Sequence, residues 1–433
     1  MSISDYRIET VEAREILDSR GNPTVQVDVR TVTGFGRFSV PSGASKGQFE
    51  AVELRDRDAQ RYLGLGVLKA VENVRRNLGP DVRGMDAREQ REIDSRMLEL
   101  DGTSNKSHLG ANSILGVSVA VARAAADTAG VPLYKFVSQH HSPLVPVPMM
   151  NILNGGKHAG NELSFQEFMI IPAGLKNFRD ALRCGSEVYH VLGKRLERKL
   201  GRAAVNVGDE GGFAPPLKSV HKALEEVNLA VEEAGYSPGR EVLLGIDPAA
   251  DSFYDEKSGT YMVDGKPLSA ERLFTMYCEL CDSFPLQSIE DPFHDEDFAS
   301  FSSLTKRLGP GTQIVGDDLF VTNSGRIEKG ASQGAANALL IKLNQAGTIT
   351  ETVDAIEAAR KAGYGLVVSH RSGETEDSTI ADLAVAYAAG QIKTGAPARG
   401  ERTAKYNRLL EIEVELGDEA RFFGPSFLKS HSS

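Results

Sequence analysis

The most constraining feature of this sequence is a pattern that recurs between residues 243 and 393. An apolar run, typical of a strand buried on both faces, ends abruptly in charged or polar side chains. Three consecutive examples, LQSIEDPF, QIVGDDLF and ALLIKLNQ, lie between residues 286 and 345, and a helical pattern follows each of them. Strands and helices that alternate in this way predict a β/α barrel with its functional site at the C-terminal ends of the strands.

Six successive strands of this region end in a side chain of a type used in catalysis or ligand binding. Their last residues are Asp247, Glu290, Asp317, Lys342, the pair His370 and Arg371, and Lys393. Charges can simply mark the point where a buried strand emerges into water. That alternative explains one or two strand ends, but it explains poorly a set that contains acids, two lysines, a histidine and an arginine.

Composition narrows the class of protein. The chain has 433 residues, 41% of them hydrophobic, which is enough for a large core without disulfide support. Its formal net charge of −11 argues against a nucleic-acid surface. The first residues form no apolar signal segment, and no stretch is apolar over the length of a bilayer, so we expect no membrane partner and a cytoplasmic location.

The C-x-x-C at Cys278 and Cys281 lacks a second ligand pair and indicates a helix core better than a zinc site.

The N-terminal part follows a different pattern. Residues 3–40 alternate between apolar and polar positions, which predicts an antiparallel meander, and helical spacing follows at 66–80, 86–100 and 109–130. A proline-rich stretch then marks a boundary. We therefore predict an α+β cap domain over residues 1–142 and a modified β/α barrel over residues 143–433 that carries the site.

The acids Asp247, Glu290 and Asp317 would meet at the mouth of such a barrel. Carboxylate oxygens are the ligands of hard divalent cations such as Mg²⁺, and three converging acids repel one another unless a cation lies among them. The alternative is that they accept hydrogen bonds from backbone amides.

Lys342 and Lys393 end two further strands. A lysine beside metal ions and a second lysine has its charged form disfavoured and can act as a base, although each can also be a plain ion-pair partner.

Three further segments offer candidate residues. NILNGGKHAGNELSFQEF contains His158, Gln166 and Glu167, and Glu210 lies in the glycine-flanked turn VNVGDEGG, where a glutamate can act as a general acid or be an ordinary surface residue. VVSHRSGETED places Arg371 next to Ser372, a combination suited to phosphate.

These segments resemble the motif set of the enolase family. The fragments SGAS, HAGNELSFQEFM, GDEGGFAPP, SIEDPF, VGDDLFVTN, LIKLNQAGT, SHRSGETED and IKTGAPARGER occur in the family's order. The similarity extends from about residue 6 to about residue 415. The motif sequences resemble archaeal-type enolases more than the usual bacterial ones.

The resemblance implies a Mg²⁺-dependent hydro-lyase that reversibly dehydrates 2-phosphoglycerate to phosphoenolpyruvate, with two Mg²⁺ ions per site, and a homodimer. It implies Lys342 as the base, Glu210 as the acid with Glu167 beside it, and Asp247, Glu290 and Asp317 as ligands of one metal ion. It also implies Ser45 as the residue that closes over the second metal ion. The expected substrate contacts are His158, Gln166, His370, Arg371, Ser372 and Lys393.

The sequence departs from the family pattern in a few places. Lys46 stands where Thr is usual, Phe49 where His is usual, Leu65 where Lys is usual, and Ala346 where Ile is usual; Pro248 also follows Asp247 in an unusual segment. Lys46 adds a cation that we include as a hypothetical substrate contact, and Ala346 adds room. These departures leave open a related enzyme of phosphonate metabolism, resembling carboxyphosphonoenolpyruvate synthase, that takes an additional phosphonylated anion. A non-catalytic binding protein on the same scaffold would usually lack Glu210 or Lys342, and both are present.

Overall fold

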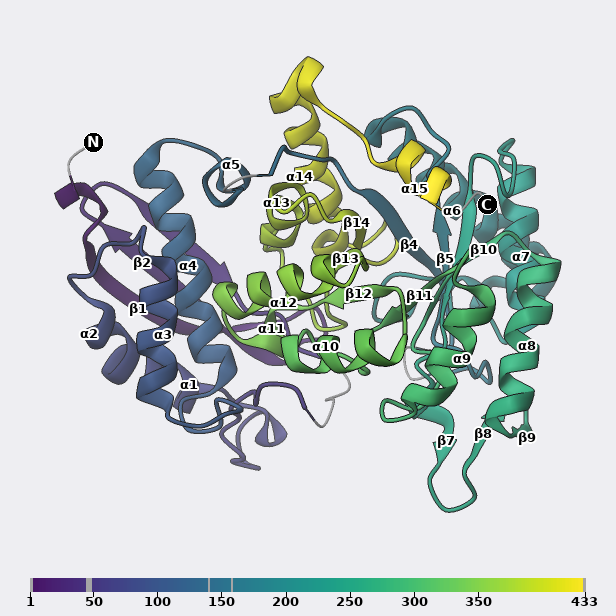
Figure 1. Cartoon of the computed structure of the whole chain (residues 1–433), viewed down its shortest axis with the longest axis horizontal. Helices are drawn as coiled ribbons and strands as arrows, with labels where there is room; N and C mark the ends of the chain where they lie inside the picture. Colours follow the sequence, from purple (N-terminus) through teal and green to yellow (C-terminus); the bar gives the residue numbers. More distant parts are fainter. Residues whose placement is uncertain (1–2, 44–48, 139–140, 157–158, 431–433) are drawn as a thin grey trace.

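An N-terminal unit lies beside a barrel in the computed structural model, as Figure 1 shows. The structure describes residues 3–43, 49–138, 141–156 and 159–430. Within these ranges, no helix is both long and apolar enough to cross a membrane. The arrangement agrees with the fold class predicted from the sequence.

The N-terminal unit consists of a three-stranded antiparallel sheet covered by helices. The strand order is β1-β2-β3, and α4 packs against β2 and β3 (Figure 1). The elements are β1 (Ile8–Leu17), β2 (Pro23–Thr31), β3 (Phe35–Ser39), α1 (Leu68–Asn73), α2 (Gly79–Val82), α3 (Gln90–Asp101), α4 (Ala111–Ala129) and α5 (Leu133–Val137).

Helix α4 is able to lie directly on the sheet because its contact residues are small. Nearly all its positions are buried, and they are rich in Ala. The helix ends at Gly130, whose left-handed backbone (φ 67°) is a typical C-cap. On the sheet side, Gly36 of β3 faces the helix so closely that a Cβ there would collide with the carbonyl oxygen of Ala120. The fit of sheet and helix therefore depends on the absence of a side chain at residue 36.

The second unit is a closed eight-stranded barrel with one reversed strand. Its order is β10-β11-β12-β13-β14-β4-β5-β6, and β5 runs antiparallel to both of its neighbours. Most strands are fully buried, as predicted from their apolar runs. Their bounds are β4 (Val147–Asn154), β5 (Glu167–Ile171), β6 (Leu243–Asp247), β10 (Leu286–Glu290), β11 (Gln313–Gly316), β12 (Ala338–Ile341), β13 (Gly365–Ser369) and β14 (Gly390–Lys393).

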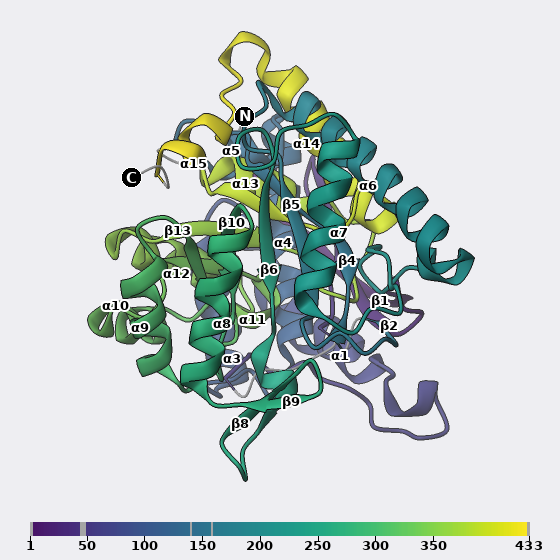
Figure 2. The ribbon, with the colours of Figure 1, turned by 90° about the vertical axis from the view of Figure 1, so that its right-hand side faces the viewer.

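Helices surround the barrel (Figure 2). Polar side chains cap the first turn of several of them. Thr348, for example, accepts a hydrogen bond from the backbone N–H of Glu351 (3.0 Å) and so caps the start of the helix that follows it. The helices are α6 (Phe178–Leu200), α7 (Val220–Glu233), α8 (Ala270–Ser283), α9 (Phe298–Leu308), α10 (Ser324–Gln333), α11 (Leu343–Ala346), α12 (Ile349–Lys361), α13 (Thr379–Ala386), α14 (Gly400–Leu416) and α15 (Gly424–Ser430).

The alternation of strand and helix is less regular after residue 242 than the sequence suggested. Between β6 and α8 the chain forms a small antiparallel sheet of three strands, β7 (Tyr254–Asp255), β8 (Thr260–Val263) and β9 (Lys266–Leu268). This sheet projects from the barrel in Figure 2. The prediction of regular alternation was therefore wrong here, because short polar strands joined by tight turns give no buried-strand pattern.

The N-terminal unit contacts the barrel through α3 and α4, which pack on α11 and α12. Two buried side chains of the N-terminal unit hold the start of α12: Ser118 Oγ accepts from the Ile349 N–H (3.0 Å) and Asp94 accepts from the Thr350 N–H (3.0 Å). Because α11 directly follows Lys342 at the end of β12, the N-terminal unit lies close to the C-terminal ends of the barrel strands.

We predict that Gly36→Ala destabilises the protein by about 1–3 kcal/mol, because the added methyl group forces β3 away from α4. Chemical denaturation followed by circular dichroism would measure the change. Gly400→Ala is the control, since a Cβ at residue 400 meets no atom within 4 Å. Equal stabilities of the two variants would contradict the close packing of β3 on α4.

Candidate active site

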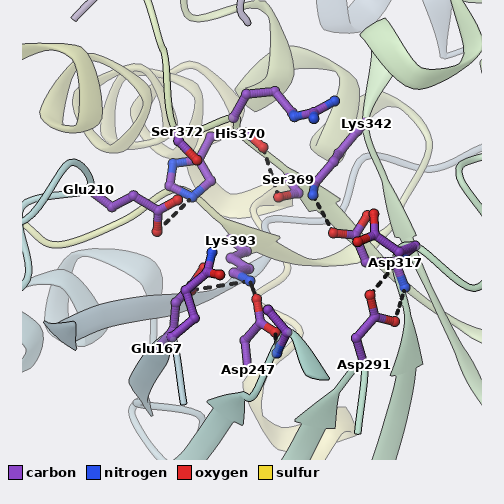
Figure 3. A pocket seen from close by; sticks show the side chains of 14 residues that line it. Glu167, Glu210, Asp247, Asp291, Asp317, Lys342, Ser369, His370, Ser372 and Lys393 are labelled. Carbon is purple, nitrogen blue, oxygen red and sulfur yellow. Dashed lines mark hydrogen bonds and ion pairs between the residues drawn. The ribbon is translucent and has the colours of Figure 1, made fainter. Parts of the chain in front are cut away.

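The C-terminal ends of the barrel strands surround a polar cavity of about 40 Å³, drawn in Figure 3. Ten of the residues predicted from the sequence line it: Gln166, Glu167, Glu210, Asp247, Asp317, Lys342, His370, Arg371, Ser372 and Lys393. Glu290 is buried beside this cavity, in contact with Lys393. The other predicted residues, Ser45, Lys46 and His158, lie outside the described residues.

Lys393, the last residue of β14, is the central positive charge of the cavity. Its Nζ donates to Asp247 Oδ2 (3.0 Å) and to both oxygens of Glu290 (2.9 and 2.8 Å), and it lies 3.1 Å from Glu167 Oε2. Burial alone would lower the pKa of Lys393, but the surrounding carboxylates, Asp247 first, raise it well above its ordinary value. Lys393 is therefore a permanent cation that neutralises the acids of three neighbouring strands.

Lys342 follows β12 and is ion-paired with the carboxylate of Asp317. The sequence analysis expected its charged form to be disfavoured beside metal ions and a second lysine, and this stays a prediction. Burial alone would lower the pKa of Lys342, but the charge of Asp317 outweighs burial and raises it. The ion pair with Asp317 thus favours the protonated form of Lys342 in this arrangement.

Three aspartates form the acidic wall next to Lys342. The carboxylate of Asp291 accepts the backbone N–H groups of Asp317 (2.9 Å) and Asp318 (2.7 Å), so it fixes the chain where β11 ends. Burial, followed by the charge of Asp317, raises the pKa of Asp318 to about 8. Burial likewise raises the pKa of Asp291 well above its usual range. The negative charges of these three aspartates repel one another, and a proton or a metal cation among them would reduce that repulsion.

The chemistry of these acids fits a divalent cation. The predicted ligands Asp247, Glu290 and Asp317 follow adjacent strands, and each already contacts a lysine ammonium group. Among the described residues, oxygens of Asp291, Asp317 and Asp318 lie within 4.8 Å of one another, so Asp317 belongs to both groups. Buried carboxylates this close together cannot all be ionised unless a cation lies among them. They are therefore suited to Mg²⁺, which prefers such oxygen ligands.

Glu167 reaches the cavity because β5 is reversed. It is the first residue of β5 and pairs in register with Asp247, the last residue of β6. The beginning of the reversed strand therefore lies level with the ends of the parallel strands. Burial, and next the charge of Glu210, raises the pKa of Glu167 well above its usual range. Two buried glutamates that influence each other in this way are suited to share a proton.

Glu210 extends from the glycine-flanked turn toward His370, as Figure 3 shows. Its Oε2 accepts from Asn151 Nδ2 (3.0 Å) and lies 3.5 Å from His370 Nε2. Gly211 adopts a left-handed backbone (φ 87°) in this turn, which explains the glycine. The side chain of Glu210 is 2% exposed, so the acid predicted from the sequence is buried inside the cavity wall rather than on a surface turn.

Arg371 is held by Glu50, a residue that the sequence analysis did not single out. The guanidinium contacts both oxygens of Glu50 (3.2 and 3.3 Å) and Asn344 Oδ1 (2.9 Å). Gln345 Nε2 in turn donates to Asp317 Oδ1 (2.9 Å) and approaches Glu50 Oε1 (3.3 Å). Glu50 thus links the N-terminal unit to both the arginine and the acidic wall.

Some site residues could have been found from the sequence and others not. Asp291 and Asp318 are the second acids of the Glu-Asp and Asp-Asp pairs at two strand ends, so a sequence signal existed for them. Glu50, Asn151 and Gln345 had none, because each acts through a partner distant in the chain.

Two departures from the family pattern meet in a second cavity. Phe49 and Ala346 both line a space of about 210 Å³, together with Gln345, which is also bonded to Asp317. The expectation that Ala346 leaves room therefore agrees with the local geometry. The room lies behind Gln345 and not among the acids and lysines of the first cavity.

The fold and this site define a β/α-barrel enzyme whose acids and lysines gather at one end of the strands. Family models for the enolase N-terminal domain and the enolase C-terminal TIM barrel domain match residues 8–137 and 142–431. The chain belongs to the enolase family, which confirms the resemblance seen in its sequence, and it is a hydro-lyase.

Curated relatives agree over nearly the whole chain. The enolase of Thermococcus gammatolerans is 58% identical over 422 residues, which cover 98% of both chains. That of Methanopyrus kandleri is 58% identical over 420 residues, 97% of this chain and 98% of the relative. That of Methanocaldococcus jannaschii is 59% identical over 413 residues, 95% of this chain and 96% of the relative.

We predict that Glu50→Ala lowers the free energy of unfolding by about 3–5 kcal/mol, because it leaves the guanidinium of Arg371 buried without its carboxylate. The matched control is Asp354→Ala. Asp354 also joins the barrel to the N-terminal unit, through Arg91, but both side chains are largely exposed (45% and 65%). That pair should contribute at most about 1 kcal/mol. Equal losses in urea denaturation would argue against a special role for Glu50.

Proposed function

We propose that this protein catalyses the reversible dehydration of 2-phosphoglycerate to phosphoenolpyruvate, with Lys342 as base and Glu210 as acid. The observation that carries the assignment is that one cavity holds Lys342 on one side of Lys393 and the pair Glu210 and Glu167 on the other (Figure 3). A dehydration that removes a proton from one carbon and hydroxide from the next needs a base and an acid in such separate positions.

Lys342 removes the proton from C2 of the substrate once Asp317 no longer holds its ammonium group. The negative charge that develops on the substrate carboxylate is stabilised by the fixed charge of Lys393. Glu210, with Glu167 beside it, then delivers a proton to the departing C3 hydroxyl, which leaves as water. A lysine base combined with Mg²⁺ is the arrangement already described for the enolase superfamily, so this pairing is not a deduction from the present geometry.

Two Mg²⁺ ions complete the proposed site. Asp247, Glu290 and Asp317 would hold one of them, and Ser45 is assigned to the second on the family resemblance. When bound, the cations supply positive charge that stabilises the developing carboxylate charge. Asp317 would then have a stronger partner than Lys342, so the pKa of Lys342 would fall and the side chain could act as the base.

The remaining predicted residues would bind the substrate. Arg371 and Ser372 offer bidentate and hydroxyl contacts for the phosphate, and Gln166, His158 and His370 complete the set. The hypothetical contact from Lys46 belongs to the alternative with a second phosphonylated anion. The enolase relatives favour the simple dehydration over that alternative. A homodimer, a domain boundary between residues 142 and 143, and a cytoplasmic location remain part of this proposal, on the family resemblance.

We predict that Asp317→Ala abolishes calorimetric binding of Mg²⁺ and lowers kcat at least about 100-fold, because it removes an acid of the proposed metal site and the partner of Lys342. The matched control is Asp295→Ala. Asp295 belongs to a second group of possible metal ligands, with Asp251 and His294, which is less buried and outside the cavity. Unchanged Mg²⁺ binding in Asp317→Ala would remove Asp317 from the metal site.

We predict that Lys342→Ala and Glu210→Gln fail at different steps. Lys342→Ala should stop the exchange of the C2 hydrogen of 2-phosphoglycerate with deuterated solvent, because it lacks the base. Glu210→Gln should slow formation of phosphoenolpyruvate by about 10²–10⁴-fold while exchange continues, since proton removal precedes loss of hydroxide. Proton NMR follows the exchange and ultraviolet absorbance the product. Equal loss of exchange in both variants would show that the roles are wrongly divided.

A further inference from the structure

Arg402 is a fully buried arginine that joins two segments of the active-site wall. It lies in the first turn of α14, and its side chain is 0% exposed. Nη1 donates to His370 Nδ1 (2.6 Å) and to the carbonyl oxygen of Arg371 (2.7 Å). Nη2 donates to the carbonyl oxygens of Ser372 (2.6 Å) and Asp209 (3.0 Å). One planar group thus connects the end of β13 to the turn that carries Glu210.

These contacts determine where His370 carries its proton. A guanidinium group is always protonated and has only donors, so a ring nitrogen that it bonds must be the acceptor. Nδ1 of His370 is therefore unprotonated. Burial, opposed in part by the charge of Glu210, lowers the pKa of His370 to about 3, so the ring is neutral. A neutral ring with a bare Nδ1 carries its single proton on Nε2.

The Nε2–H group that results is aimed at the proposed acid. Nε2 is buried and lies 3.5 Å from Glu210 Oε2. The same oxygen already accepts from Asn151. The site therefore directs two N–H donors at Oε2, so a proton to be delivered by Glu210 is favoured on its other oxygen, Oε1.

The packing around Gly395 keeps this arrangement compact. Gly395 has a left-handed backbone (φ 80°), and a Cβ there would lie 2.7 Å from the Glu210 carbonyl oxygen, 2.9 Å from Arg402 Cδ and 3.2 Å from His370 Cε1. Glu210, Arg402 and His370 thus all approach the backbone of Gly395, where no side chain intervenes. Because they are packed this closely, a small displacement of one of them also displaces the others.

We propose that Arg402 is a positioning residue for the reaction: it fixes His370 as the Nε2–H tautomer and orients that N–H toward Glu210. Arg402 does not itself line the cavity, and it acts through His370 and the backbone of residues 371, 372 and 209. The inference rests on the proposed role of Glu210 as acid, but the tautomer of His370 can be measured without any turnover.

The first test is the tautomer itself. Long-range ¹H–¹⁵N NMR of full-length protein with ¹⁵N-histidine distinguishes a protonated from a bare ring nitrogen, and the His370 signals are identified by their loss in His370→Gln. We expect wild-type His370 to show a bare Nδ1 and a protonated Nε2, unchanged between about pH 5 and 8. A protonated Nδ1 in the wild type would overturn the proposal, whatever the activity of the enzyme.

The second test compares variants on one helix. Arg402→Met should give a mixture of tautomers and lower kcat about 100-fold, with KM changed far less, because the acid is misplaced rather than the substrate lost. Arg402→Lys keeps a cationic donor, but its single nitrogen cannot reach both segments, so it should recover part of kcat. Arg408→Met is the control. Arg408 is a cation of the same helix, paired with Asp382 and Glu415 away from His370, and its loss should change neither readout.

The outcomes separate this inference from the proposed function. A single Nε2–H tautomer in Arg402→Met, or kcat values equal to those of Arg408→Met, would overturn the role of Arg402. If Arg402→Met does not fold, the wild-type spectrum and Arg402→Lys still decide. A wild type with the expected tautomer but no conversion of 2-phosphoglycerate would instead contradict the proposed function.

Discussion

The whole active site depends on the compensation of buried negative charge. Among the residues that the structure describes, six carboxylic acids line the first cavity, and Lys342, Arg371 and Lys393 are the cations that oppose them. The cost of burying ionised acids is high unless each has a close partner. The structure meets this cost with ion pairs, with backbone amides bonded to Asp291, and with raised pKa values at Glu167, Glu290 and Asp318. An excess of buried acid is the electrostatic reason why the site is suited to divalent cations.

The barrel provides the positions for these charges, and its irregularities supply the rest. Parallel strands bring Asp247, Glu290 and Lys393 to one end. The reversed β5 adds Glu167 at the same level. Glu210 comes from a loop, but the loop is tied to β4 by Asn151 and to the end of β13 by Arg402, so its side chain is as well fixed as one on a strand. Fixed charges need no reorganisation during the reaction, which is where such sites obtain most of their effect.

The sequence predicted the barrel and the strand-end residues because both depend on local pattern. A buried strand must be apolar and must end where polarity begins, so Asp247, Lys342 and Lys393 could be placed from the chain alone. The direction of the Lys342 pKa could not, because it depends on which partner lies closest in three dimensions, and that partner is Asp317. Glu50 and Arg402 could not be identified from the sequence for the same reason. Glu50 contacts Arg371, 321 residues away, and Arg402 contacts His370, 32 residues away.

The size of the cavity adds a further constraint on how the site works. A space of about 40 Å³ holds little more than ordered water, far less than a phosphorylated three-carbon acid with its cations. The cations that line it are engaged in ion pairs, Lys393 with Asp247 and Glu290, Lys342 with Asp317, and Arg371 with Glu50. Each pair joins a proposed substrate- or proton-binding cation to an acid, and three of those acids, Asp247, Glu290 and Asp317, are proposed metal ligands. In the proposed mechanism, binding of substrate and metal would therefore exchange partners within the site: the acids would hold the metal ions, and the lysines and the arginine would contact the substrate. The ion pair with Asp317 that stabilises Lys342 in this state also raises its pKa, so the proposed base needs another partner for Asp317 before it can accept a proton.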